Sequence, residues 1–378
     1  MKRISIFIFL LILILLTSAL SFSQWKGKKE IKKGVIYMSN SEKGLWQGSK
    51  KLVMEEIFTI GVEEGDDEYL LSMPICVETD SSDNIYIADM QDDFIKVYDN
   101  TGKFLRQIGR RGQGPGEFQE LLWMSFTPTS KICVNEDYGP LRKISILTLT
   151  GDFIRSFVVN DIIVSRMAGD FRGETLFFTR KMPPLNFKKF YQHDYYFEVY
   201  QYDMHGKLIN KFCELEGAGK ISGIDHYAKW GYIATRGNGD LLIAFSYPYI
   251  IKLYDTKGNH KKTITKKSKA FKPPRFIEEE IVPGRRIGRF ELNAEIRNIL
   301  VLPDDNFLIR IFNRDPDLNN KNGSKTFYDL FDSEGHFLQS FFWNERIIHV
   351  DDKGFAYTIT SFEDIPKVKK YKMSFSNK

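Results

Sequence analysis

The residue types that most often carry catalysis occur in this chain, but their spacing does not favour it. None of its six histidines stands at zinc-ligand spacing from another. The three cysteines, Cys76, Cys133 and Cys213, form no Cys-x-x-Cys pair, and each lies in an apolar alternating run. We therefore expect buried thiols rather than a zinc site, a disulfide framework or a redox centre. A Gly-x-Ser-x-Gly motif is also absent, so the sequence predicts no catalytic residue.

Carboxylates are the other candidates for chemistry. Many of them fall in segments that we expect to form loops on one face of the fold: Asp89, Asp92, Asp93, Glu136, Asp137, Asp194, Asp315, Asp317, Glu363 and Asp364. Oxygen ligands converging from several loops would suit Ca²⁺. No Asp-x-Asp-x-Asp-Gly loop is present, so a calcium site would have to be discontinuous. We predict no cofactor, with Ca²⁺ as the alternative and its ligands unassigned.

Aromatic side chains beside charged ones are the best candidates for binding a partner, because such combinations are typical of interaction hot spots. Two long segments contain candidates, one rich in glycine and one rich in aromatic residues. For both segments we predict contacts with a protein, a peptide or a glycan. The residues concerned are Arg110, Arg111, Phe187, Tyr191, Asp194 and Tyr195.

A third segment, beginning at Lys266, is rich in basic residues. It could bind an anionic glycan, a lipid headgroup or an acidic protein. Acidic residues such as Glu278–Glu280 partly offset its charge, so a solvated loop surface is the alternative. The whole chain has a net charge of +5, which is too small to indicate nucleic-acid binding. The basic residues are Lys266, Lys267, Lys269, Lys272, Arg275, Arg285, Arg286 and Arg289.

The N-terminus has the features of a targeting segment. A basic start precedes the apolar run Ile4–Leu16, and Ser21 and Ser23 supply the small residues of a cleavage site. We predict a signal peptide over residues 1–23 and an N-terminal linker over residues 24–50. The alternative is an uncleaved anchor, because the apolar region is almost long enough to span a bilayer. We therefore expect an exported protein, periplasmic or extracellular, with membrane anchoring as the alternative.

A turn that recurs along the chain predicts the fold. In its first copy, Tyr98–Gly102, Asp opens the turn and Gly takes the positive-φ position of a hairpin. The turn returns at Gly151, Gly206, Gly258 and Gly335, a period of roughly 50 residues, each time between two apolar alternating runs. Short strands and turns at this period are typical of a β-propeller. With 42% hydrophobic residues the chain can bury the core of one such domain, which we expect to be all-β and monomeric.

We predict six blades over residues 51–378, each of four antiparallel strands, labelled a to d from the centre outwards. The sixth blade lacks a fourth strand after the run at 368–374. Leu52–Ile60 alternates and has no other partner, so we expect it to become the outer strand of that blade. Closing the ring in this way removes two exposed sheet edges.

The first blade resembles a known repeat. Asp83–Asp89, Ile95–Asp99 and Gly102–Phe104 look like the NHL-type repeat, and Arg110–Phe118 resembles the loop of exported bacterial 6-bladed beta-propeller proteins related to NHL repeats. The resemblance covers roughly residues 70–120, and later repeats depart from it. It implies a six-bladed propeller with a binding role and no particular activity.

In a propeller the b–c and d–a connections emerge on one face, and the a–b and c–d turns emerge on the other. Long loops on one rim of a rigid scaffold are where binding usually resides. We therefore predict an exported, non-enzymatic propeller that binds its partner through these connections. The long ones lie at 110–120, 180–194, 266–295 and 313–325.

Two alternatives remain open. A metal-dependent hydrolase or lyase of the gluconolactonase-like propeller type would need inward-facing acids on several blades. The innermost strands, such as Ile75–Val77 and Ile299–Leu302, are instead mostly apolar.

The loop Gly112–Gly116 could form a backbone nest for an anion. Because it lacks the Lys-Ser/Thr of a P-loop, we interpret it as a connector that lets Phe118 pack between blades.

Overall fold

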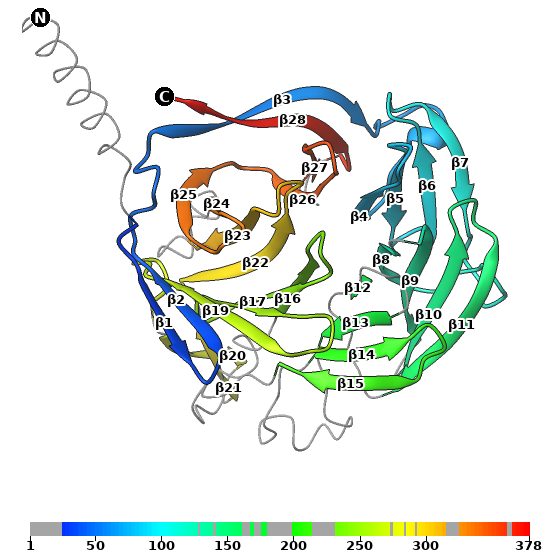
Figure 1. Cartoon of the computed structure of the whole chain (residues 1–378). Coiled ribbons are helices and arrows are strands. Elements are labelled where there is room, and N and C mark those ends of the chain that lie inside the picture. The colour runs from blue at the N-terminus through cyan, green and yellow to red at the C-terminus, as the bar shows by residue number, and fades with distance from the viewer. Residues whose placement is uncertain are drawn as a thin grey trace, which may run out of the picture.

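The chain forms a closed ring of β-sheets that radiate around a central axis (Figure 1). Six sheets are the blades of a propeller, so the predicted all-β, six-bladed fold is confirmed. We call the side with the b–c and d–a connections, such as 109–120 and 246–249, the loop face, and the opposite side the turn face. This computed structural model describes residues 25–127, 129–138, 141–160, 167–169, 175–179, 199–213, 231–272, 275–282, 285–291, 293–314, 325–360 and 365–378.

Each blade has four antiparallel strands, a to d in order. Blade one consists of β4 (Pro74–Thr79), β5 (Ile85–Asp89), β6 (Phe94–Tyr98) and β7 (Phe104–Ile108). Blade two consists of β8 (Leu121–Thr127), β9 (Lys131–Tyr138), β10 (Leu141–Thr148) and β11 (Phe153–Asn160). Blade three consists of β12 (Met167–Gly169), β13 (Thr175–Thr179), β14 (Val199–Asp203) and β15 (Leu208–Phe212). Blade four consists of β16 (Gly231–Thr235), β17 (Leu241–Phe245), β18 (Ile250–Tyr254) and β19 (His260–Lys266). Blade five consists of β22 (Ala294–Val301), β23 (Phe307–Asn313), β24 (Lys325–Phe331) and β25 (Phe337–Phe342). Blade six consists of β26 (Arg346–Val350), β27 (Phe355–Ile359), β28 (Val368–Asn377) and β3 (Lys50–Ile60). Outside the blades lie the 3₁₀ helix η1 (Asp67–Tyr69) and a hairpin of β20 (Arg275–Val282) and β21 (Arg285–Glu291).

The ring closes as predicted. β3 and β28 pair antiparallel, from Ile60 opposite Val368 to Lys50 opposite Asn377. The outer strand of blade six therefore comes from the N-terminal side of the chain, and the other three come from its C-terminal end (Figure 1). Each of the two strands thereby covers a backbone edge that the other would otherwise expose.

Residues 24–50, predicted as a linker, instead contain two strands of a sheet. β1 (Lys28–Lys32) and β2 (Val35–Asn40) form a hairpin, and both residues of its Lys33–Gly34 turn have a positive φ, 49° and 81°. β2 pairs in parallel with β19, so the sheet of blade four has six strands. The apolar side of β2 explains the addition, because Met38 is 2% exposed within the core between blades four and five.

The predicted signal peptide, residues 1–23, lies outside the described residues. In the described part of the chain, no helix is both long and apolar enough to cross a bilayer. Trp25, the first residue described, already packs edge-on against His336, with 4.8 Å between ring centroids.

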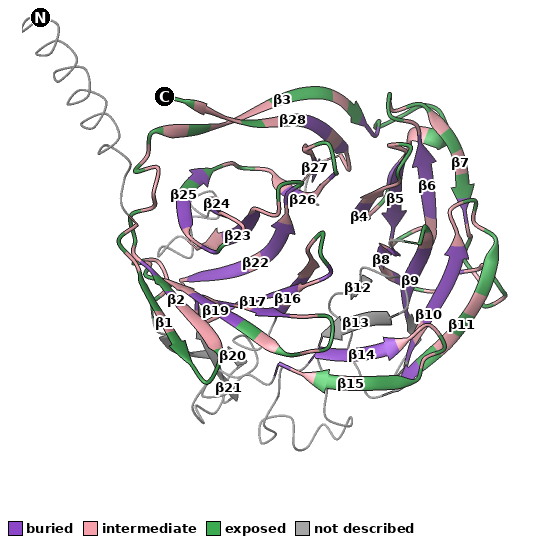
Figure 2. Ribbon diagram, viewed as in Figure 1, coloured by how far each residue is buried: buried purple, intermediate pink, exposed green. Residues whose placement is uncertain are grey.

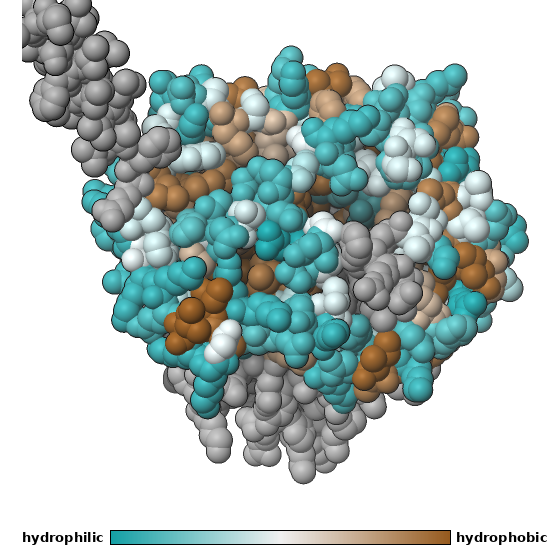
Figure 3. Space-filling model, in the orientation of Figure 1, coloured by the Kyte–Doolittle hydropathy of each residue, from teal (hydrophilic) through white to brown (hydrophobic). Residues whose placement is uncertain are grey.

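Six apolar clusters, one between each pair of neighbouring blades, form the core. The middle strands are largely buried, whereas the outer strands β7, β11 and β15 are largely exposed (Figure 2). The surface in the same view is mostly hydrophilic, with small separate hydrophobic patches (Figure 3). The thiols of Cys76, Cys133 and Cys213 are buried within the clusters, as predicted. Burial raises the pKa of Cys133 and of Cys213 to about 12, which makes both thiols unreactive.

The repeated turn glycine also packs the blades together. In blades one to five the glycine of the c–d turn lies against the outer strand of the preceding blade. A residue with a Cβ would meet that strand, and every one of these glycines has a positive φ. The contacts join Gly102 to Phe58, Gly151 to Ile108, Gly206 to Phe157, Gly258 to Phe212 and Gly335 to Ile264.

Alanine at Gly335 is expected to destabilise the fold more than alanine at Gly354. Both glycines have a positive φ, 93° and 83°, so each substitution strains the backbone by about 1 kcal/mol. At Gly335 the new Cβ would also lie 2.5 Å from Ile264, whereas nothing lies within 4 Å of a Cβ at Gly354. Overpacking adds about 2 kcal/mol, so urea unfolding should separate the two variants by that amount. Equal losses of stability would show that the blade contact contributes nothing.

Candidate functional site

The glycine-rich loop between β7 and β8 acts as the predicted connector. Phe118 is fully buried, and its ring lies against Gly109. The Glu117 carboxylate accepts a hydrogen bond from the backbone N–H of Gly114 at 2.9 Å, which folds the loop back on itself. This bond first, and then the Arg110 guanidinium, lower the pKa of Glu117.

Two predicted partner contacts, Arg110 and Arg111, lie on this loop, and each pairs with a different carboxylate. Arg110 pairs with Glu117 at 2.8 Å, and 78% of its side chain is exposed. Arg111 pairs at 2.8 Å with Asp93, which is buried. Arg111 therefore ties the loop to blade one, although 69% of its side chain is exposed, whereas the partner of Arg110 lies within the loop itself. The other predicted contacts lie outside the described residues: Phe187, Tyr191, Asp194 and Tyr195.

The buried carboxylates of the loop face serve the fold. Each accepts a hydrogen bond from the backbone of a connection, at 2.8 to 3.0 Å: Asp89 from Ser72 and Met73, Asp93 from Leu121, and Glu136 from Gln119. Among the described residues, no three His, Cys, Asp or Glu side chains are grouped closely enough to hold a metal ion. The remaining members of the predicted set, apart from Asp92, lie outside the described residues or have undescribed side chains: Asp137, Asp194, Asp315, Asp317, Glu363 and Asp364.

A groove of about 640 Å³ opens on the loop face of blade four. Its walls come from the b–c connection, from the residues that follow β19 and from the segment after β2. It lies at the start of the basic segment that the sequence singled out. Its lining includes Tyr247, Pro248, Tyr249, Lys267, Lys269 and Phe271.

A buried network forms the floor of this groove. Asp329, 1% exposed, accepts hydrogen bonds from the Tyr249 hydroxyl at 2.6 Å, from the Lys266 ammonium at 2.7 Å and from the Ser340 hydroxyl. The Lys266 ammonium also lies 4.0 Å from the ring centroid of Phe337. Burial, and then the charge of Asp329, raise the pKa of Tyr249 well above its usual value, so its hydroxyl stays a donor. The floor is thus rigid and has its charges paired.

The rim of the groove is positive. Lys267 and Lys269 are exposed, and Lys269 is 89% exposed although it lies 3.8 Å from Glu42. Tyr249 packs against Phe271 with 4.9 Å between ring centroids, so aromatic surface lies beside the lysines. This combination suits a partner that offers both apolar and negatively charged groups.

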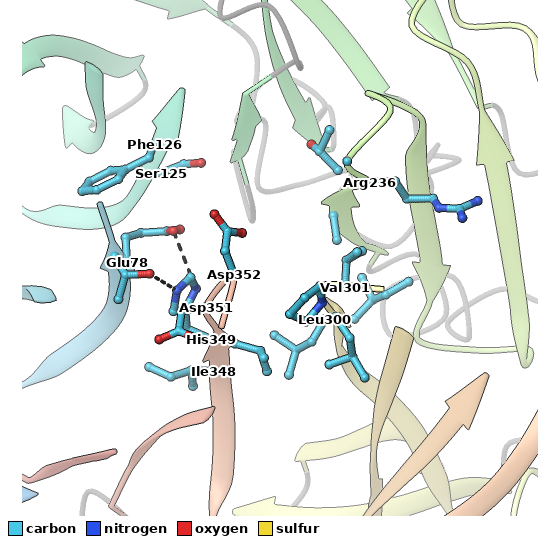
Figure 4. Close-up of a pocket in the computed structure, with 18 of the residues that line it drawn as sticks. Glu78, Ser125, Phe126, Arg236, Leu300, Val301, Ile348, His349, Asp351 and Asp352 are labelled. Carbon is cyan, nitrogen blue, oxygen red and sulfur yellow. Dashed lines mark hydrogen bonds and ion pairs between the residues drawn. The ribbon is translucent and has the colours of Figure 1, made fainter. Parts of the chain in front are cut away.

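A second cavity, of about 540 Å³, lies between the inner strands of the blades and reaches the a–b turns of the turn face. Its described lining comes from inner strands and from the a–b turns that follow them. Apolar side chains such as Ile233, Ile299 and Val350 form much of the wall, which agrees with the apolar inner strands predicted from the sequence. Polar side chains gather at the strand ends near the mouth (Figure 4).

Glu78 and His349 meet in this cavity from blades one and six. Glu78 Oε2 lies 3.7 Å from His349 Nδ1, and the Thr79 hydroxyl lies 2.8 Å from Nε2 (Figure 4). The Glu78 side chain is 22% exposed and the His349 side chain is 17% exposed. Burial is nevertheless the cause of the pKa shift of each group. Burial raises the pKa of Glu78 to about 8 and lowers the pKa of His349 to about 4. At neutral pH both side chains are therefore mostly uncharged.

Most of the described charged residues at the mouth have a partner within the protein. Arg236 lies 3.5 Å from Asp305 on the neighbouring blade. Asp351 is buried and accepts a hydrogen bond from the Tyr357 hydroxyl at 3.1 Å. Asp352, next in sequence, is exposed, and its carboxylate points into the cavity (Figure 4). The mouth thus offers hydrogen-bond acceptors to a ligand.

The residues of this cavity were not among the predicted site residues. The inner strand of blade one was described by its apolar part, Ile75–Val77, but Glu78 and Thr79 follow at once. His349 stands in the corresponding region of blade six. Polar residues at the ends of inner strands, just before the a–b turns, were the available signal.

Comparisons with known proteins agree with this architecture. A family model described as 6-bladed beta-propeller (DUF5128) matches residues 64–264. No curated protein matches the chain. A solved structure of a DUF4221 family member from Bacteroides vulgatus has 11% sequence identity and a TM-score of 0.59, and the match covers 88% of this chain and 100% of that one.

Two further solved structures are similar to the chain. A protein of Bacteroides fragilis described as exported has 11% identity and a TM-score of 0.55, over 89% of this chain and 99% of that one. A streptogramin B lyase has 11% identity and a TM-score of 0.46, over 85% and 98%, and is too distant to bear on function. At such identities structural likeness shows the fold alone. Because the family match spans more than half of the chain, this protein belongs to the 6-bladed beta-propeller family.

Proposed function

We propose that this protein is an exported, non-enzymatic propeller that binds a partner on its loop face. Export is supported by the targeting features of residues 1–23 and by the likeness to a Bacteroides fragilis protein described as exported. The periplasm or the extracellular space is then the place of action, with anchoring as the alternative if residues 1–23 are retained.

The groove of blade four carries the proposal. Its floor is fixed by the Asp329 network, so a partner meets a preformed surface. Its aromatic and proline walls suit apolar side chains, and the exposed Lys267 and Lys269 suit carboxylates. Of the partners considered from the sequence, we favour a peptide segment of another protein with acidic and apolar residues. A glycan is the alternative.

The contacts predicted from the sequence are further candidates on this face. Arg110 and Arg111 are both mostly exposed on the same face, and each pairs with a carboxylate of the protein, Glu117 and Asp93. Phe187, Tyr191, Asp194 and Tyr195 belong to another long connection of the loop face and remain proposed contacts. A partner that spans several connections would explain why they are long while the turns of the other face are short.

A metal-dependent hydrolase or lyase is the alternative function. It needs carboxylates that converge on an ion. The buried acids of the described loop face, Asp89, Asp93 and Glu136, are already acceptors for backbone N–H groups, which favours binding over catalysis. Stoichiometric Ca²⁺ or Zn²⁺ in the purified protein would favour the enzyme instead.

Charge reversal at the groove is expected to weaken peptide binding. A display library of random peptides, selected on the exported protein, should yield sequences with acidic and apolar residues. Lys267→Glu combined with Lys269→Glu should weaken the selected peptides at least tenfold, about 1.4 kcal/mol, because attraction becomes repulsion. Binding should also weaken as salt is added. Affinity is measured by fluorescence anisotropy on labelled peptides.

The control is the same charge change on the turn face. Lys103 and Lys257 are exposed in c–d turns, so Lys103→Glu with Lys257→Glu should leave peptide affinity unchanged. Selected peptides without acidic residues, or equal loss in both double variants, would refute the assigned face.

A further inference from the structure

The second cavity has the size and lining of a small-ligand site. Its volume of about 540 Å³ falls within the roughly 300–1,000 Å³ typical of such pockets. Trp123 and Phe126 contribute aromatic surface, and Ser125, Asn298 and Asp352 contribute hydroxyl, amide and carboxylate groups. Rings with flat apolar faces and a rim of hydroxyl groups fit a wall of this mixed kind.

The described side chains of the cavity favour a ligand that donates hydrogen bonds. Glu78 and His349 are mostly uncharged at neutral pH, since burial raises the pKa of Glu78 and lowers that of His349. Among the described lining residues, Arg236 supplies the permanent positive charge and is paired with Asp305. Asp352 remains as an exposed carboxylate, which is an acceptor for O–H donors. An anion would meet the Asp351 and Asp352 carboxylates, whereas a ligand that offers hydroxyl groups would find hydrogen-bond acceptors there.

We propose that this cavity binds a neutral saccharide of one or two sugar units, entering from the turn face. The aromatic rings of Trp123 and Phe126 contact the apolar face of a sugar ring. The Asp352 carboxylate accepts hydrogen bonds from sugar hydroxyls, and the Glu78 carboxyl, which lines the same cavity, offers a further hydrogen-bonding group. This site is separate from the groove of the loop face and does not depend on the proposed peptide binding.

Saturation-transfer NMR on the full exported chain tests the proposal. The probes are cellobiose, maltose, lactose and N,N′-diacetylchitobiose at millimolar concentration, with choline as a cationic probe. At least one disaccharide should show transfer, and choline should show none. Asp352→Ala should weaken the bound sugar about tenfold, the effect of losing one charge-assisted hydrogen bond. Phe126→Ala should weaken it as well, and its folding is checked by circular dichroism.

The control lies next to Asp352. Lys353 is exposed in the same turn but pairs with Asp83 outside the cavity, so Lys353→Ala should bind the sugar like the parent protein. The Lys267→Glu and Lys269→Glu variant should also keep sugar binding, which separates this site from the groove. Absence of transfer from every disaccharide, binding of choline alone, or unchanged affinity in Asp352→Ala would each overturn the proposal.

Discussion

Replacing Asn40 with alanine is expected to lower the free energy of unfolding by about 4 kcal/mol. Asn40 is 2% exposed, and its amide makes four hydrogen bonds. The Nδ2 group donates to the carbonyls of Thr265 and Gly335 at 3.2 and 3.0 Å. The Oδ1 atom accepts from Phe337 N at 2.9 Å and from Trp25 Nε1 at 2.8 Å. Each buried partner left unsatisfied costs roughly 1–3 kcal/mol, and entering water recovers part of this.

Urea unfolding measures the loss, and Asn259→Ala is the control. Asn259 is exposed in the c–d turn of blade four and donates only to Asp255, so its removal should cost less than about 1 kcal/mol. Because Asn40 ties β2 to blades four and five, the variant should also release residues 25–40 to protease before the ring unfolds. A change at Asn40 no larger than at Asn259 would mean that β1 and β2 are not part of the cooperative fold.

This N-terminal extension shows why the sequence predicted the ring but not all of its strands. The turn glycines recur because each one satisfies a local conformation and a contact with the preceding blade. Because both constraints require glycine at the same turn of each blade, the glycines recur along the sequence. β1 and β2 occur once, and their identity as strands depends on an edge of blade four that is distant in sequence. Within the segment itself, only the Lys33–Gly34 turn indicated that β1 and β2 form a hairpin.

Inner strands were harder to recognise for a related reason. An inner strand is covered on both faces, so it need not alternate. β8, Leu121–Thr127, reads as a nearly continuous apolar run, and β12, Met167–Gly169, has three residues. The middle strands, in contrast, stand between recurring turns. Their positions follow from the turns even where their own pattern is weak.

The candidate sites depend on convergence that sequence spacing does not encode. Glu78 and His349 are far apart along the chain and meet only because β3 closes the ring and places blade six beside blade one. The basic segment after Lys266 was recognised from its composition. Which of its lysines is buried against Asp329 and which are exposed depends on the packing of blades four and five.

Replacing Asp329 with alanine is expected to cost about 4 kcal/mol of stability and to abolish peptide binding at the groove. The change leaves the Lys266 ammonium, 6% exposed, without its anion and the Tyr249 hydroxyl without its acceptor. Removing one partner of a buried ion pair typically costs about 3–5 kcal/mol, because the remaining charge is uncompensated. The groove floor should then rearrange as Lys266 moves towards solvent. Urea unfolding and peptide anisotropy measure the two effects.

The matched control is Glu334→Ala. Glu334 pairs with Lys262 at 3.3 Å and is 71% exposed, and Lys262, 9% exposed, keeps its hydrogen bond to the backbone carbonyl of residue 334 after the change. The loss of stability should therefore be smaller than at Asp329, and peptide binding should stay intact. If Asp329→Ala were no more harmful than Glu334→Ala, the network would not be what fixes the floor.

A double variant, Asp329→Leu with Lys266→Met, separates charge from shape. With both charges replaced by apolar groups no uncompensated ion remains, so most of the lost stability should return. Lys267 and Lys269 are untouched in this variant and still line the rim. If the groove acts through its shape and these exposed lysines, peptide binding should return with the stability. If stability returns and binding does not, Lys266 itself contacts the partner, and the positive site extends from the rim to the floor.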